Sequence, residues 1–410
     1  MDRTLPHSGD VSSPIVTKGK TAWLAVVLGS LSAFAPLSID MYLPAFPAMA
    51  RELTVSPSDI QLTLTACTIG LAVGQLIAGP LSDRLGRRGP LLVGLVIYLI
   101  ASAACIFAPS ATTLTILRLV QGMGGAAGIV ISRAVARDLF DGRELAKFFS
   151  LLMLVNSLGP VVAPALGAVV LHWTTWRGVF VVLSVIGLLL LVMTTLSLKE
   201  SLPRERRHRG SLSIGSLLVD RVFLGYALSC ALAFAALFAY ISGSSFVLQD
   251  TYGLSAPLFS LVFGVNSLAI MGASQLNSWL LGRFPPRPLL AAGLVGTVVS
   301  ALALLVSVLA GLGLPGVLPA LFVLAASVGV VFPNATALAM NDHPDKAGNA
   351  SALLGTAQFL IGGVAAPLAS TAVSMGMVMT AVAVAAVLAF ALLTRASTRK
   401  PAIDRPAVAG

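Results

Sequence analysis

The stretch GPLSDRLGRRGPLL, residues 79–92, is a short charged loop between two long apolar runs, at roughly 59–81 and 89–108. Each run is close to the length of about 20 residues that a helix needs to cross the hydrocarbon core of a bilayer. Lipid offers backbone groups no hydrogen-bond partner, and the runs lack the alternation of barrel strands, so they must be helical. The stretch therefore predicts two membrane-spanning helices joined by a tight loop.

Apolar runs of this length recur along the whole chain of 410 residues. Hydrophobic residues make up 57% of it, charged residues only 10%, and the mean hydropathy is +0.94. Soluble domains carry about 25% charged residues, so this composition excludes a soluble protein. The twelve runs lie at roughly 23–46, 59–81, 89–108, 112–136, 147–171, 177–197, 221–243, 256–281, 288–310, 315–340, 348–373 and 376–394.

Positive charge is concentrated on one side of the predicted membrane. If the N-terminus lies inside, all but three of the 26 lysines and arginines fall in segments that face the cytoplasm, the exceptions being Arg51, Arg118 and Arg177. This asymmetry follows the positive-inside rule and predicts an even number of spans with both termini in the cytoplasm. The basic run RERRHRG, residues 204–210, is then a topology anchor, and nucleic acid is not an expected partner.

Metal sites and enzymatic chemistry find no support in the sequence. The three cysteines lie inside predicted spans as small apolar residues, and the four histidines lack ligand spacing. There is no nucleophile–base pair and no Gly-x-x-x-x-Gly-Lys-(Ser/Thr) phosphate loop. We therefore expect a protein that is not an enzyme and that uses neither a metal nor another cofactor.

The residue types of the 79–92 loop indicate a gate. Gly79 and Gly86 permit a tight turn and a close helix approach, and Asp83 can accept hydrogen bonds from a helix N-terminus. Three arginines hold the loop inside and can pair with acidic partners; they are Arg84, Arg87 and Arg88. A plain basic anchor would explain the arginines but not the glycine and aspartate spacing, so we favour a gating loop.

An internal repeat divides the chain. LGRRGPLLVG (85–94) follows the second run and LGRFPPRPLLAAG (281–293) follows the eighth, an offset of nearly half the chain. Such an offset is typical of a parallel repeat about an axis along the membrane normal. We predict an all-α integral membrane protein of twelve helices in two six-helix bundles related by a pseudo-two-fold axis. The predicted parts are a tail (1–22), the first bundle (23–197), a cytoplasmic linker (198–220), the second bundle (221–394) and a tail (395–410).

Two opposite charges lie inside predicted spans at matching depth. Asp40 sits in AFAPLSIDMYLPAFP (33–47), and Arg118 lies about two turns into the fourth run, with Gln121 on the same face. A charge at mid-membrane costs about 2.5–3.5 kcal/mol on insertion scales, so it needs a partner or a wet cavity. We expect Arg118 to hold ionised Asp40, so that small rearrangements load or release a proton. Alternatively, Arg118 extends to the outer surface and Asp40 meets water there.

These motifs resemble those of the major facilitator superfamily. GPLSDRLGRRGPLL is similar to its loop motif between spans two and three, and ILRLVQGMGGAAG (116–128) to its Arg-x-x-Gln-Gly motif with small residues following. DMYLPAFPAM (40–49), NSLGPVVAPALGAVV (156–170), WRGVF (176–180) and PNATALAMNDHPDKAGNASALLG (333–355) resemble more specifically the Bcr/CflA drug-resistance group of proton-coupled multidrug antiporters.

The resemblance implies a multi-pass exporter of the bacterial inner membrane that works by alternating access. Its expected partners are protons, the lipid bilayer and a drug of the bicyclomycin, chloramphenicol or florfenicol type, and we expect a monomer. The same resemblance implies that Asp40, Tyr42, Arg118 and Gln121 belong to the proton or substrate site. The alternative function is proton-coupled uptake or export of a small metabolite such as a sugar or an amino acid. KESLPRERR (199–207) faintly resembles the Pro-Glu-Ser-Pro-Arg motif of sugar porters, but no proline precedes Glu200.

The fifth predicted span departs from the family's antiporter motif. Gly159 and Pro160 fit, but Ala163 and Pro164 replace its glycine pair. Pro160 and Pro164 still remove backbone hydrogen bonds and bend the helix, and Gly159 and Gly167 still allow close packing. We therefore expect the bent helix interface to be kept, although this motif alone does not separate antiport from symport.

The predicted spans of the second half hold no charged residue in their interior; Arg221 stands at the start of one. Polar residues at mid-span, one of them in the fifth span, are Asn156, Asn266 and Gln358. Each is either a substrate contact or a hydrogen-bonding link between helices. Phe234, Phe238 and Tyr240 could form an aromatic wall, but lipid-facing residues are the simpler interpretation.

Overall fold

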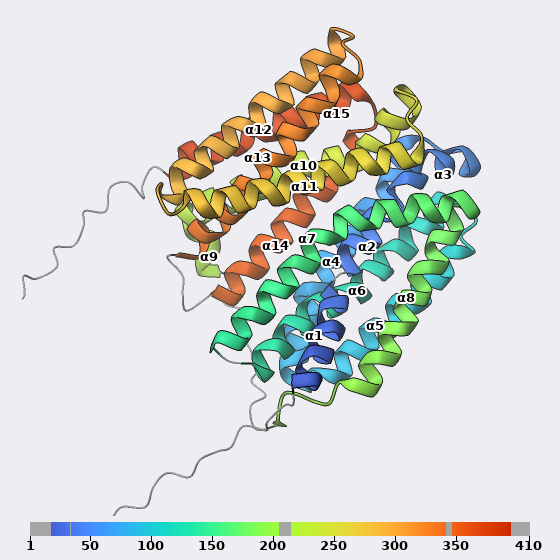
Figure 1. Ribbon diagram of the computed structural model, residues 1–410, viewed down its shortest axis with the longest axis vertical. Coiled ribbons are helices and arrows are strands. Elements are labelled where there is room, and N and C mark those ends of the chain that lie inside the picture. Colours follow the sequence, from blue (N-terminus) through green and yellow to red (C-terminus); the bar gives the residue numbers. More distant parts are fainter. Residues whose placement is uncertain (1–17, 33, 141, 205–214, 342–346, 395–410) are drawn as a thin grey trace, which may run out of the picture.

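The structure, a computed structural model, describes residues 18–32, 34–140, 142–204, 215–341 and 347–394, and the regular structure in these ranges is helical (Figure 1). Ten helices in these ranges are long and apolar enough to cross a membrane. They are α4 (Pro57–Leu85), α5 (Arg88–Ile106), α6 (Ala111–Leu139), α8 (Trp176–Ser197), α10 (Arg221–Phe246), α11 (Ala256–Leu280), α12 (Pro286–Leu309), α13 (Leu314–Asn341), α14 (Ala347–Ala365) and α15 (Ala372–Leu393).

The first and fifth predicted spans have irregular shapes. The first is divided between α1 (Lys18–Ser32) and α2 (Phe34–Asp40). It counts as an eleventh span if Val26–Ser32 and Pro36–Leu53, which are bent by 41° relative to each other, form one span. The fifth lies in α7 (Gly142–Trp173), of which Leu158–Trp173 is a shorter apolar helix. Short helices complete the fold: η1 (Leu43–Ala45), α3 (Phe46–Leu53), α9 (Gly215–Val219), the π-helical turn η3 (Val247–Thr251) and η5 (Ala366–Leu368).

Beyond the 41° bend between Ser32 and Pro36, prolines favour a second break, directly after Asp40. Helix α2 ends at Asp40, and a two-residue turn leads into η1, whose first turn holds Pro44; α3 then begins with Pro47 in its first turn. Proline lacks an N–H and is tolerated in the first turn of a helix, so each one favours a new start here. The expected span at 23–46 is thus broken directly after its carboxylate, which leaves Asp40 at a helix C-terminus.

The helices form two groups that lie side by side in Figure 1. In the first group, α6 packs against α4 and α5, and α5 packs against α8; in the second, α10 packs against α13, α14 and α15, and α12 packs against α13 and α15. The groups meet where α11 packs on α7 and where α14 packs on α4. A site shared by the two groups must therefore be built from these helices and from α2 and α10.

The small residues that follow Gln121 in α6 permit the closest packing in the first group. A Cβ atom at Gly122 would collide with the carbonyl oxygen of Cys67 in α4, and one at Gly124 would lie 2.6 Å from the backbone nitrogen of Tyr98 in α5. Only glycine allows backbones to approach so closely. This close packing fixes α6 between its two neighbours.

Candidate functional site

Arg118 of α6 is fully buried, and its guanidinium is held by uncharged groups. One Nη donates to Gln121 Oε1 at 2.5 Å and the other to the carbonyl oxygen of Ser38 at 2.7 Å. The guanidinium also lies over the Tyr42 ring, 4.2 Å from its centroid, which is cation–π geometry. Gln121 in turn donates to Ser102 Oγ at 2.7 Å. These contacts tie α6 to α2 and α5, and they exclude the alternative in which Arg118 extends to the outer surface.

Asp40 points away from this network. Ser38, two residues earlier in α2, shares a hydrogen bond of 2.8 Å with Tyr98 of α5, inside the first helix group. Residues two apart on a helix differ by about 200° in direction, so the Asp40 side chain is directed away from that group. The carboxylate is buried, at 4% exposure, and lies near enough to Tyr240 of α10 for its charge to act on that phenol. Asp40 therefore belongs to the boundary between the groups.

The expected ion pair between Asp40 and Arg118 is not formed. Within the described ranges Asp40 has neither a hydrogen bond nor an ion pair, and the Arg118 guanidinium binds Gln121 and the Ser38 carbonyl instead. The physical reason is the break after Asp40: it brings the Ser38 carbonyl and the Tyr42 ring to the guanidinium and turns the carboxylate elsewhere. The prediction of a direct pair is wrong for this structure.

The second helix group presents an aromatic and amide cluster near Asp40. Asn266 of α11 donates to the Tyr240 hydroxyl at 2.8 Å, and the Tyr240 ring stacks on Phe263 with centroids 5.7 Å apart. Phe238 and Tyr240 are 1% and 2% exposed, so the lipid-facing interpretation is wrong for them. The reason is that α10 is covered by three helices of its own group and also touches α4.

The other predicted polar residues have separate surroundings. Gln358 of α14 donates to Cys230 Sγ at 3.0 Å, inside the second group. The side chain of Asn156 lies outside the described part of the structure. Tyr42 shares a hydrogen bond of 3.3 Å with Thr63 of α4, so it supports Arg118 from the side.

The prolines of α7 expose backbone acceptors to the second group. Pro164 has no N–H, so the carbonyl of Pro160, four residues earlier, lacks its helical partner. The Ser267 hydroxyl of α11 lies 3.4 Å from that carbonyl and 2.9 Å from the carbonyl of Phe263 in its own helix, so the two acceptors share its one proton. The Ser260 hydroxyl is shared in the same way between the carbonyls of Pro164 at 3.0 Å and Ala256 at 2.9 Å. The bent interface predicted for α7 is therefore the place where α7 meets α11.

Two glycines of α7 allow it to lie against α2. A Cβ atom at Gly159 would come within 2.7 Å of the Pro36 ring, and one at Gly167 would collide with the Met41 carbonyl oxygen. Met41 is the residue after Asp40, so Gly167 keeps α7 against the turn that holds the carboxylate. A larger residue at this position has to displace that turn.

The loop at residues 79–92 forms an ion-pair cluster around Arg87, which is 8% exposed. Its guanidinium donates to Asp83, to Ser82 Oγ at 2.9 Å and to Asp138 Oδ2 of α6 at 2.8 Å. Burial disfavours its charge, but the two carboxylates outweigh this and raise the pKa of Arg87 above its usual value. Gly86 ends α4 with φ at +97°, a conformation that suits glycine alone. We call the end of the molecule that holds this loop the Arg87 end.

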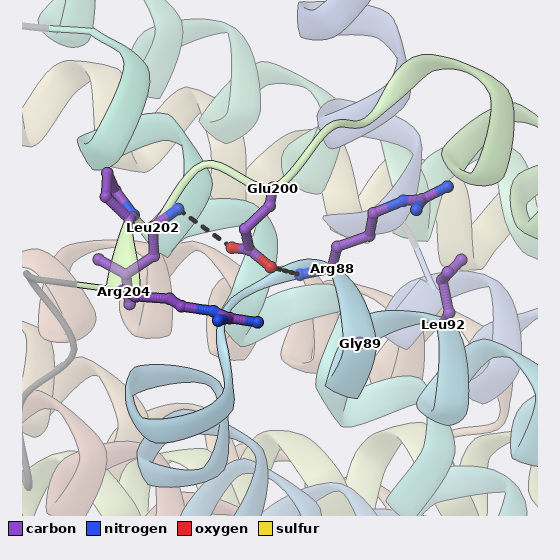
Figure 2. Close-up of a pocket in the computed structure, with 7 residues that line it drawn as sticks. Arg88, Gly89, Leu92, Glu200, Leu202 and Arg204 are labelled. Atoms are coloured by element: carbon purple, nitrogen blue, oxygen red, sulfur yellow. Dashed lines mark hydrogen bonds between the residues drawn. The ribbon is translucent and has the colours of Figure 1, made fainter.

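Glu200, after α8, accepts the hydrogen bonds from a helix N-terminus that the sequence suggested for Asp83. Its carboxylate accepts from the backbone N–H groups of Arg88 at 3.2 Å and Leu202 at 3.0 Å (Figure 2), and from that of Arg87 at 2.7 Å. It therefore caps the start of α5, while Asp83 binds the Arg87 side chain instead. The assignment of Asp83 to a helix N-terminus is wrong. Of the other loop residues, Arg88 donates to the Thr195 carbonyl at 3.0 Å, Arg84 is exposed, and a Cβ at Gly79 would make an ordinary contact with Val130.

At the opposite end, which holds α3, side chains of α4 bind backbone carbonyls of the second group. Gln61 is fully buried and donates to the carbonyls of Ser242 at 3.2 Å and Ala369 at 3.1 Å. Thr65, one turn further along α4, donates to the Gly363 carbonyl at 2.7 Å. That carbonyl is unpaired within α14 because Pro367 stands four residues later. These bonds join the groups at the α3 end.

The irregular segments after Asp40 add further contacts at the α3 end. Ser245 and Gln249 of the second group donate to the carbonyls of Leu43 at 2.6 Å and Pro44 at 3.3 Å. Arg51 and Asp250 form an ion pair of 3.1 Å between the groups. The α3 end is therefore closed in this structure.

The sequence model of the Major Facilitator Superfamily matches residues 28–367. The chain belongs to the Major Facilitator Superfamily. It is therefore a membrane transporter and not an enzyme, as the sequence predicted. In the described residues no three His, Cys, Asp or Glu side chains gather where they could hold a metal ion.

Of three relatives within the superfamily, two carry names from drug resistance. An "uncharacterized MFS-type transporter YdgK" of Bacillus subtilis (strain 168) is 43% identical and covers 91% of this chain and 95% of its own. A "bicyclomycin resistance protein homolog" of Haemophilus influenzae is 34% identical, over 90% of this chain and 95% of its own. "Multidrug resistance protein MdtL" of Klebsiella pneumoniae (strain 342) is 30% identical over 79% and 82%. The expected membership of the Bcr/CflA-like group is confirmed.

Solved structures show the same superfamily fold. A bacterial homologue of the human lysosomal transporter Spinster, inward-facing and occupied, matches with a TM-score of 0.75 at 15% identity, over 93% of this chain and 98% of its own. A D-xylose–proton symporter matches with a TM-score of 0.72 at 16% identity, over 92% and 98%. At such identities the likeness shows the fold alone.

Sequence reasoning missed several residues of this superfamily member that the structure brings to the boundary or the loop. They are Tyr240 as a neighbour of Asp40, Gln61 and Thr65 at the α3 end, and Asp138 and Glu200 at the Arg87 end. The polar Gln61 and Thr65, four residues apart in an apolar helix, were a usable signal. Asp138 and Glu200 were acidic residues beside predicted cytoplasmic loops with arginines to bind.

Proposed function

We propose that this transporter exports drug-like small molecules in exchange for protons, with Asp40 as the proton-carrying group. The observation that carries the proposal is a buried carboxylate at the boundary of two helix groups, within electrostatic reach of Tyr240 and without a hydrogen bond or ion pair in the described ranges. Such a group can exchange protons with whichever side water reaches it from. The drug-resistance names of two relatives support the same substrate class.

In the proposed cycle the two helix groups, 23–197 and 221–394, rock about this boundary. We place the Arg87 end in the cytoplasm, because the basic segments lie there, so the present arrangement is closed to the outside. A proton from outside neutralises Asp40 and releases the drug; loss of that proton to the cytoplasm restores drug binding. One proton moving inward gains about 2.3 kcal/mol per 100 mV of membrane potential.

The chemistry of the boundary favours neutral or weakly polar drugs. Asp40 is the acid near the aromatic cluster, Asn266 supplies an amide, and the Arg118 charge is shielded by Tyr42. A site with several acids would select polycations, whereas aromatic walls with a few polar groups suit compact amphiphilic molecules. Bicyclomycin, chloramphenicol and florfenicol are compounds of this kind.

The test is a compound panel in a drug-sensitive bacterial host, followed by transport in everted membrane vesicles. Expression should raise resistance to one or more of the three drugs, and an uncoupler should remove the effect. Everted vesicles should accumulate the drug when they are energised and should release lumenal protons when it is added. Proton-driven loss of a metabolite from such vesicles, without drug transport, would establish the uptake alternative and overturn the proposal.

A further inference from the structure

A pocket of about 610 Å³ opens at the Arg87 end, between the first turn of α5 and the segment that follows α8 (Figure 2). It is lined by Arg88, Gly89, Leu92, Glu200, Leu202, Pro203 and Arg204. It lies away from Asp40 and from the boundary between the helix groups, so the transport cycle proposed above gives it no role.

The charge of this pocket is positive. Its one carboxylate, that of Glu200, already accepts hydrogen bonds from three backbone N–H groups and so serves the start of α5. Arg204 is exposed, with no hydrogen bond in the described part of the chain, and Arg88 has a buried Nε that has no partner there either. An anion is therefore the complementary ligand.

The pocket continues into a surface that hydrocarbon has to cover. Helices α5 and α8 pack on each other, and their outward residues are apolar and strongly exposed: Val93 59%, Ile100 63%, Leu189 56% and Leu196 81%. Leu92 connects the pocket to this face. A free anion would use only the charged part, whereas a phospholipid would use both parts. Basic pockets beside transmembrane helices are suited to anionic headgroups.

We propose that the pocket binds an anionic phospholipid, with its phosphate beside Arg204 in the field of Arg88 and its acyl chains along α5 and α8. Bound there, the lipid holds the segment after α8 against the start of α5. Glu200 of that segment accepts a hydrogen bond from the backbone N–H of Arg87, so the lipid stabilises the ion-pair cluster around Arg87. This inference does not rest on the identity of the transported drug.

Gly89 provides a way to block the pocket without changing its charge. A Cβ atom there meets nothing within 4 Å, so a side chain can be added without a clash. Gly89→Trp should fill the pocket, and Gly89→Ala, which adds a single methyl group, is the matched control for folding.

The test is native mass spectrometry of the purified full-length protein titrated with dioleoyl phosphatidylglycerol, with dioleoyl phosphatidylcholine as the zwitterionic comparison. We expect tighter binding of phosphatidylglycerol, an apparent affinity about fivefold weaker in Arg204→Gln, and a larger loss in Gly89→Trp. Gly89→Ala should bind like the unmodified protein. Arg283→Gln, on the loop after α11, should also bind normally, because Arg283 instead lies over the Trp279 ring.

Three results would overturn the proposal. Equal affinity for the two lipids would show that the pocket does not select an anion. Competition by glycerol 3-phosphate as effective as that by the lipid would show a free-phosphate site. Unchanged lipid binding in both Arg204→Gln and Gly89→Trp, with both variants unfolding at the normal temperature, would place the lipid elsewhere.

Discussion

Replacing the Asp40 carboxylate with an amide keeps the size of the side chain and removes the proton that the proposed cycle moves. Asp40→Asn should therefore still bind drug but should release no protons when drug is added and should show no dependence of binding on pH. Proton release measured with a pH dye on protein in detergent tests this. Asp59→Asn, at the exposed start of α4, is the control and should behave normally. Normal proton release by Asp40→Asn would exclude Asp40 as the carrier.

Arg118 is held by geometry that only a guanidinium can satisfy. Its two Nη atoms reach Ser38 and Gln121 in different directions while the plane lies over Tyr42. Lysine keeps the charge but loses one of these hydrogen bonds and the flat contact. Arg118→Lys should lower the free energy of unfolding by about 2–3 kcal/mol, measured by thermal unfolding in detergent. If its stability is unchanged, the charge alone matters and the network assigned to Arg118 is wrong.

At the scale of elements, prolines create acceptors that join the helix groups. Pro164→Ala supplies an N–H that can bind the Pro160 carbonyl and compete with Ser267. Ser267→Ala should therefore lower the transport rate less in the Pro164→Ala background than in the unmodified protein. Converted from the four transport rates, the coupling energy should be about 0.5–1 kcal/mol. Ser260→Ala is the control, because its acceptor is the carbonyl of residue 164, which either residue supplies. Additive effects for Ser267 would refute this account.

The start of α5 depends on a carboxylate that comes from beyond α8. Glu200→Gln keeps the shape of the side chain but weakens its charge-assisted hydrogen bonds to the N–H groups of Arg87 and Arg88. We expect the free energy of unfolding to fall by about 1 kcal/mol and backbone hydrogen exchange over residues 87–92 to become faster. Lys199→Gln, the adjacent charge change, should leave the exchange as it is. Equal exchange in both variants would show that Glu200 is not the cap.

At the scale of the whole molecule, the sequence predicted the class of fold but not the direction of its buried charges. Hydrophobic runs and the placement of arginines act over 20 residues at a time, so they specify helices and their order. The side chain of Asp40 is directed by one break in α2, which depends on Pro44 and Pro47 and on the packing of Gly167 against Met41. A shift of one residue turns a helical side chain by about 100°, beyond what spacing alone can resolve.

Alternating access requires the α3 end to open, so a covalent bond across that end should stop transport. Thr65 and Gly363 are suited to this, because a Cβ at Gly363 would lie 3.6 Å from Thr65 Cγ2, a γ position of the kind that the cysteine sulfur occupies. In a background with the three native cysteines replaced by alanine, Thr65→Cys with Gly363→Cys should lose drug transport on oxidation with copper phenanthroline. Dithiothreitol should restore it, and each single-cysteine variant should be insensitive. Full transport by the crosslinked protein would show that these helices do not separate during the cycle, and the two groups would then have to exchange substrate by another route.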